Sequence, residues 1–133
     1  MMQLHRRTRV LADLGRQLKE RPAELQTVVN RACTYNPWFT PQSVWQALET
    51  ITANYLNEAE LNHWISGYKI HNLPQTVKTI GLVMAGNIPM VGFHDFLSIF
   101  ISGHKAQVKL SAKDNQLFPY IVSLLEQIDA EFH

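Results

Sequence analysis

Cysteine is nearly absent from this sequence, and neither sign of charge dominates. Cys33 is the one cysteine among 133 residues, so the chain cannot form an internal disulfide, and a disulfide-stapled scaffold is excluded. Twelve basic and eleven acidic side chains leave a formal net charge of +1, which gives no strong overall attraction to nucleic acid or an acidic membrane. We therefore expect a protein of a reducing, cytoplasmic compartment with no nucleic-acid partner.

Long uninterrupted apolar runs are also missing. The most apolar stretch, residues 79–104, is long enough to span a bilayer, but Asn87, Pro89, His94 and Asp95 stand near its centre. A carboxylate at the centre of a spanning helix costs about 2.5–3.5 kcal/mol on insertion scales. We expect a buried strand, a turn and a buried helix here, and no membrane span.

The usual signatures of metal and phosphate sites are missing as well. No two of the six histidines have zinc-type spacing, and the chain contains neither G-x-G-x-x-G nor G-x-x-x-x-G-K-[ST]. We expect no metal site. Cys33 falls on the apolar side of an expected helix. We interpret it as a small buried hydrophobic side chain, because a nucleophilic cysteine needs an accessible, cationic setting.

The composition that remains is globular, with 46% apolar and 17% charged residues. The first part of the chain carries apolar side chains at helical spacing, beginning with the stripe over residues 10–18. Pro22 is placed to occupy the first position of a second helix, and Thr40 followed by Pro41 is typical of a further helix start. We predict an N-terminal helical region over residues 1–76.

The pattern changes near residue 77, where β-branched and apolar residues without polar alternation predict a strand covered on both faces. The expected elements are a strand at 77–84, a turn at 85–89, a helix at 90–102, a strand at 106–110 and a last helix capped by Asp114. The order strand, helix, strand, helix predicts parallel pairing through a right-handed crossover.

Two parallel strands make a very small sheet, whereas all-parallel sheets normally lie inside larger α/β structures. We therefore expect residues 77–133 to be an incomplete domain, which either belongs to a longer protein or buries its open edge against another copy. Self-association would use that edge and the apolar run 96–101, which a monomer is not expected to cover fully.

Polar side chains stand where each expected strand ends. Asn87 follows the first strand and Lys109 closes the second, and open parallel sheets bind ligands at that edge. There the Asn87 amide is suited to donate to a developing oxyanion, and Lys109 to bind ribose or phosphate oxygens. An ordinary turn asparagine and a solvated lysine fit the same pattern. His94 and Asp95 likewise fit either catalysis or a helix N-terminus.

Two long stretches resemble one family of enzymes. TIGLVMAGNIPMVGFHDFL at 79–97 and ISGHKAQVKLSAKD at 101–114 are similar to the bacterial acyl-CoA reductases, relatives of the luminescence fatty-acid reductase within the aldehyde dehydrogenase superfamily. NPWFTP at 36–41 also resembles the N-terminal segment of that family. The resemblance runs from about Tyr35 to the end of the chain.

The resemblance implies an α/β fold in which N-terminal helices precede the start of a parallel, Rossmann-like sheet of the aldehyde dehydrogenase type, so that residues 77–133 are part of a nucleotide-binding unit. In relatives, the asparagine that matches Asn87 helps to hold the oxyanion of the thioester-derived intermediate, and the proline that matches Pro89 shapes its turn. The lysine that matches Lys109 contacts the adenosine ribose.

The resemblance also implies a cofactor. Ser111 and Lys113 fall in the loop that corresponds to the nucleotide-binding loop of the family. Ala112 stands where NAD-preferring relatives often carry a glutamate, which would bind the ribose 2′-hydroxyl and repel a 2′-phosphate. The absence of that acid, beside Lys113, favours NADPH.

The catalytic cysteine of the family lies further along a much longer chain, and Cys33 does not match it. The resemblance therefore implies the N-terminal portion of an NADPH-dependent acyl-CoA reductase, which converts an acyl thioester such as acyl-CoA into a fatty aldehyde, with these 133 residues inactive alone. The alternative is a non-catalytic α/β module that self-associates or binds a partner, and the missing nucleophile supports it.

Overall fold

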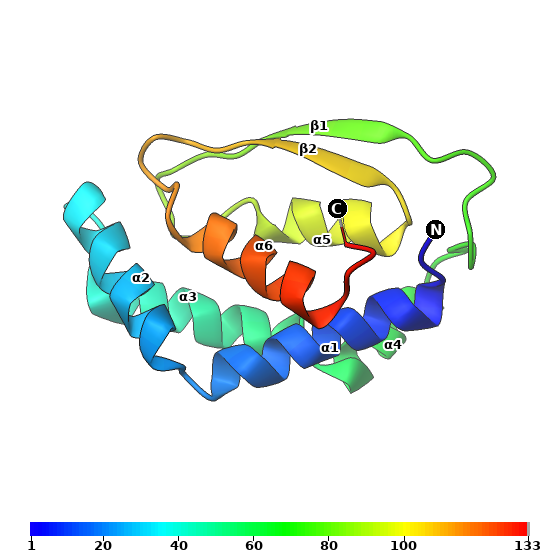
Figure 1. The fold of residues 1–133 in the computed structure, drawn as a ribbon, viewed down its shortest axis with the longest axis horizontal. Coiled ribbons are helices and arrows are strands. Elements are labelled where there is room, and N and C mark those ends of the chain that lie inside the picture. Colours follow the sequence, from blue (N-terminus) through cyan, green and yellow to red (C-terminus); the bar gives the residue numbers. More distant parts are fainter. Residues whose placement is uncertain (133) are drawn as a thin grey trace.

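The computed structural model describes residues 1–132, which form six helices and two strands. The two strands make one outer layer, α5 and α6 the middle layer, and α1 to α4 the opposite outer layer (Figure 1). The chain is thus a mixed α/β unit that is mostly helical. The elements are α1 (Leu4–Lys19), α2 (Ala23–Tyr35), α3 (Pro41–Asn54), α4 (Glu58–Ser66), β1 (Thr79–Val83), α5 (Phe93–Ile101), β2 (Lys105–Lys109) and α6 (Leu117–Ile128).

The two strands pair in parallel, with Thr79 opposite Lys105 and Val83 opposite Lys109. α5 connects them and α6 follows, so the predicted order of strand, helix, strand and helix with parallel pairing is confirmed. β1 is shorter than the expected strand 77–84, because the pairing is confined to five residues of each strand.

The sheet is covered on one face only, which corrects the expectation of two covered faces. Partly buried and exposed residues alternate along both strands. Leu82 and Val108 pack against the core, whereas Val83 on the other face is 78% exposed. The cause is the layering: α1 to α4 pack beneath α5 and α6, and within residues 1–132 no helix crosses the outer face of the sheet (Figure 1).

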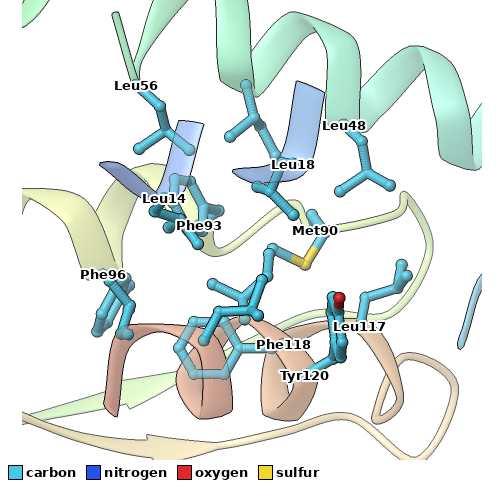
Figure 2. Packing of buried hydrophobic residues seen from close by; sticks show 14 of the residues in the cluster. Leu14, Leu18, Leu48, Leu56, Met90, Phe93, Phe96, Leu117, Phe118 and Tyr120 are labelled. Atoms are coloured by element: carbon cyan, nitrogen blue, oxygen red, sulfur yellow. The ribbon is translucent and has the colours of Figure 1, made fainter. Parts of the chain in front are cut away.

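The core lies between the middle layer and the four N-terminal helices. The predicted apolar stripe of α1 is confirmed, since its four side chains at 10, 11, 14 and 18 are all buried. Figure 2 shows Leu14 in one cluster with Phe93 and Phe118, which come from α5 and α6. Packing of α1 against both later helices therefore joins the helical first half to the second half.

The apolar run 96–101 contributes to this core, and most of it is covered within one chain, while Phe100 is only half-buried. Phe96, Leu97 and Ile101 are buried. The run is covered because α5 has neighbours on opposite sides, with the sheet on one and α1 on the other.

Capping groups set several of the helix ends. Thr40 precedes α3 as predicted: its hydroxyl accepts from the Ser43 N–H at 3.0 Å, and the Ser43 hydroxyl oxygen accepts from the Thr40 N–H at 3.0 Å. Pro22 stands one position earlier than predicted, at the N-cap of α2. Gly103, with φ +84°, follows α5 where the sequence places its end.

The two later helices begin after their predicted starts. Residues 88–92 form a turn, so α5 begins at Phe93 rather than at 90. α6 begins at Leu117 after Gln116, and Asp114 does not cap it. Instead, the Asp114 Oδ2 atom accepts a hydrogen bond from the Met90 N–H at 2.8 Å. The Asp114 carboxylate thus links the loop after β2 to the loop after β1 and does not cap α6.

Candidate functional site

The loops that follow β1 and β2 meet at the carboxyl edge of the sheet. Directly beyond the five paired residues, the Met84 N–H donates to the Lys109 carbonyl oxygen at 3.0 Å. Beyond it, Gly86 lies so close to the second loop that a Cβ atom there would be 2.4 Å from Ser111 Oγ and 2.8 Å from Lys113 Cβ. Only glycine permits this approach.

A buried asparagine ties both loops to the N-terminal helices. Asn36, at the end of α2, is 5% exposed, and its Nδ2 donates to the Gly86 carbonyl oxygen at 3.2 Å and the Lys113 carbonyl oxygen at 3.1 Å. Its Oδ1 accepts from the Trp38 N–H at 3.0 Å. One side chain therefore satisfies backbone groups of three segments and fixes their relative positions.

Asn36 lies in the segment at 36–41 that resembles the family, but no sequence pattern assigns it a role. Its partners Gly86 and Lys113 lie 50 and 77 residues further along the chain. The spacing of neighbouring residues does not predict contacts over such separations. The one local signal is the break between two helical patterns at Asn36–Pro37, where a polar residue is expected to face solvent and here is buried.

Asp114 supports the same loops from the other side. Burial of its carboxyl group raises its pKa, and the hydrogen bond that it accepts from the Met90 N–H offsets only part of that rise. Its Oδ1 atom is buried and has no hydrogen-bond partner among residues 1–132. Met90 has a left-handed backbone with φ +59°, so Asp114 holds a strained turn in place.

The structure places all four predicted site residues at this edge. Asn87 is exposed in the β1–α5 loop, directly after Gly86. Lys109 is the last residue of β2 and its side chain is exposed. Ser111 Oγ accepts from the Lys113 N–H at 3.2 Å. The Lys113 ammonium lies 5.5 Å from the centre of the Trp38 ring, within reach of a cation–π attraction.

His94 and Asp95 belong to the first turn of α5 and are both exposed. The His94 ring packs against Tyr55, with ring centres 5.2 Å apart, and against Trp64 at 5.7 Å. These rings line a pocket of about 420 Å³ beside α4. His94 thus lies in an aromatic setting formed with the N-terminal helices.

Cys33 lies on α2, half-buried, and desolvation raises the pKa of its thiol. An activated cysteine needs a lowered pKa, since the thiolate is the nucleophile. The surroundings of Cys33 therefore do not prepare it for covalent catalysis. Among residues 1–132, no group of three or more His, Cys, Asp and Glu side chains is placed to hold a metal ion.

None of the helices that the structure describes has the length and apolar character needed to cross a membrane.

The site combines an exposed amide, two exposed ammonium groups and a rigid backbone. Lys109 and Lys113 give the edge a positive character, and the nearby Asp114 carboxylate is buried and bound to the Met90 N–H. Such a surface is suited to ribose hydroxyls and phosphate oxygens, which lysine binds as a compact point charge. Comparisons of the chain with protein-family models, curated proteins and solved structures find no match.

Proposed function

We propose that this chain forms part of an NADPH-dependent acyl-CoA reductase and that the carboxyl edge of its sheet takes part in binding the cofactor and the reacting acyl group. In this proposal the two strands begin a Rossmann-like sheet of the aldehyde dehydrogenase type. The observation that carries the proposal is the contact between Gly86 and the loop at 111–113, which joins the segment of Asn87 to the segment of Lys109.

The loop after β2 is chemically suited to a 2′-phosphate. Lys113 is exposed and cationic, and Ala112 beside it carries no acid. Asp114 is buried and bound to the Met90 N–H, so no exposed carboxylate stands at 109–114 to repel a phosphate. In the proposal Lys109 binds the ribose, Ser111 and Lys113 bind the 2′-phosphate, and NADPH when bound supplies the hydride.

The proposed role of Asn87 follows from the chemistry of thioesters. When a thiolate attacks the acyl carbon, the carbonyl oxygen becomes an oxyanion, and CoA leaves as a thiolate when the carbonyl re-forms. An amide N–H at the oxyanion stabilises that transition state, and loss of one such donor costs about 100- to 1,000-fold in turnover. Asn87 is exposed at a loop held on both sides, so it is free to donate from a fixed backbone. The thiolate is not assigned to Cys33.

A second candidate function is the binding of another protein chain at the sheet. The outer face of β1 and β2 is uncovered, with Val83 78% exposed, and both strands have open edges within residues 1–132. Open strand edges are templates for pairing. This function requires neither a nucleophile nor a cofactor.

The first proposal is tested by cofactor preference. NADPH is expected to bind the purified chain more tightly than NADH, and Ala112→Glu should weaken NADPH about tenfold while sparing NADH. Two unit charges 4 Å apart interact by about 1 kcal/mol in water, and a 2′-phosphate carries nearly two. Fluorescence titration of the reduced nicotinamide measures both constants.

Ala112→Gln is the matched control, because it adds the same bulk without the charge and should leave the NADPH affinity near that of the unchanged chain. Equal losses for both cofactors in Ala112→Glu, or the same loss in Ala112→Gln, would show that this loop does not hold the 2′-phosphate.

A further inference from the structure

A second hollow lies away from the loop cluster, beneath the inner face of the sheet. It is an open cavity of about 620 Å³ between the strands, α5, α6 and the N-terminal residues. Residues at the amino ends of the strands border it, among them Val77, His104 and Lys105. One end of the cavity thus lies at the edge of the sheet opposite Asn87, and its volume is within the range of about 300–1,000 Å³ found for small-molecule sites.

Phenylalanine rings form much of its wall. Phe96 and Phe118 meet edge to face with centres 5.0 Å apart, and Phe100 and Phe132 do so at 5.4 Å. Aliphatic side chains of the inner sheet face and α6 add to this apolar part of the lining. Interiors leave few voids larger than a water molecule, and a roomy apolar cavity favours an apolar occupant over water.

A buried cation also lines the cavity. Arg7 is 2% exposed, and its Nε donates to the Ile101 carbonyl oxygen at 3.0 Å. Its Nη1 donates to the carbonyl oxygens of Met2 and Asn72, and its Nη2 to that of His71 at 3.3 Å. Four of its five N–H groups are thus bound to backbone carbonyls. None of these partners is a carboxylate.

A buried charge ordinarily has an opposite charge beside it. Desolvation lowers the pKa of Arg7, which reflects the cost of holding this cation without one. The carboxylate that borders the cavity, Glu131, is already paired with Arg6 at 2.8 Å. Its charge is therefore compensated outside the cavity.

The other polar groups of the wall are donors. His104 Nδ1 accepts from the Lys78 N–H at 3.3 Å, so the neutral ring carries its proton on Nε2. Lys105 borders the same end, but its side chain belongs to the exposed face of β2, like that of Gln107. The buried charge of the lining, that of Arg7, is therefore positive, and it lies at the end of the cavity where the chain passes from α5 to β2.

We propose that this cavity binds a ligand made of one unbranched alkyl chain and a carboxylate head group. The alkyl chain lies along the phenylalanine rings and the inner face of β2. The carboxylate lies at the cationic end, where Arg7 has one N–H left and His104 supplies a further donor. This site is separate from the carboxyl edge of the sheet, and the inference does not depend on the proposed reductase function.

The test uses dodecanoate below its micelle concentration, titrated into the purified chain by calorimetry. One molecule should bind per chain. Dodecyltrimethylammonium, which has the same alkyl chain and the opposite charge, should bind at least about tenfold more weakly, because its head group meets the positive end of the cavity. Butanoate, which lacks the long chain, should not bind measurably.

Ala106→Trp places a large ring on the inner face of β2 and should abolish dodecanoate binding. Gln107→Trp, one residue further along and on the exposed face, is the matched control and should bind dodecanoate unchanged. Val122→Phe, which narrows the cavity from α6, replaces Ala106→Trp if circular dichroism shows that the latter does not fold. Absent binding, equal binding of the two dodecyl ligands, or equal binding by a folded cavity variant and Gln107→Trp would overturn the proposal.

Discussion

Two buried polar side chains shape the carboxyl edge of the sheet. Asn36 reaches the loops at Gly86 and Lys113 from the end of α2, and Asp114 reaches Met90 from the second loop. Each one satisfies a backbone group that would otherwise lie near the core without a partner. The loop that carries Asn87 and the loop that follows Lys109 are thus held by residues with no chemical part in the proposed reaction.

Asn36→Ala is predicted to destabilise the chain by about 2–3 kcal/mol, since a buried backbone acceptor left without its donor costs about 1–3 kcal/mol. The same change should weaken NADPH binding, because the two loops lose their common anchor. Urea denaturation followed by circular dichroism measures the first effect, and fluorescence titration the second.

Asn30→Ala is the matched control. Asn30 lies on the exposed face of the same helix, where its Oδ1 accepts only from Gln26 Nε2 at 2.9 Å. Its loss should cost less than about 0.5 kcal/mol. Similar stabilities for the two variants would show that the loop contacts of Asn36 contribute little.

Among the elements, α1 has the widest role, because it contacts α3, α4, α5 and α6. It crosses the junction between α3 and α4 at Gly15. A Cβ atom at Gly15 would lie 2.5 Å from the Leu56 carbonyl oxygen. Glycine is unfavourable inside a helix, and here it is required by the close approach of another backbone.

Gly15→Ala is predicted to destabilise the fold by up to about 2 kcal/mol, because overpacking costs about 1–3 kcal/mol and the helix-propensity gain offsets about 1 kcal/mol of it. Gly81→Ala makes the same change in β1, where nothing lies within 4 Å of the added atom, and it should be neutral or stabilising by about 0.5 kcal/mol. Thermal denaturation of both variants measures the contrast. A stabilised Gly15→Ala chain would contradict the close crossing.

The elements that the sequence predicts well are those with a local signal. The helical stripe of α1 and the Thr40 cap of α3 depend on neighbours a few residues away, and both are confirmed. The sequence predicts Asp114 as the cap of α6, because a carboxylate before a helix is a typical cap, and nothing local indicates that the Met90 N–H competes for it. It also predicts two covered faces of the sheet where the structure has one, because apolar composition does not reveal how many helix layers lie on each side.

At the scale of the whole molecule, the sheet is the least protected part. It has two strands, open edges within residues 1–132, and one face without a helix. Val83 lies on that face and is 78% exposed. Helices cover the buried faces of parallel sheets on both sides in most α/β proteins, so an uncovered outer face is a surface for association.

The purified chain is therefore predicted to self-associate at high micromolar concentration. Val83→Lys should shift the equilibrium toward monomer, because a lysine at an exposed strand opposes edge pairing and apolar contact. Sedimentation equilibrium measures both. A stable monomer at these concentrations, or an unchanged equilibrium in Val83→Lys, would contradict a role for this face.

The central claim, that the carboxyl edge of the sheet binds NADPH, is tested most directly by mapping the cofactor onto the chain. In amide nitrogen–hydrogen correlation spectra, titration with NADPH is predicted to shift the backbone signals of residues 85–88 and 109–115 with one saturation curve. The amides around the phenylalanine cavity should keep their positions. Saturable shifts confined to other residues, or no saturable shift at either loop, would contradict the claim.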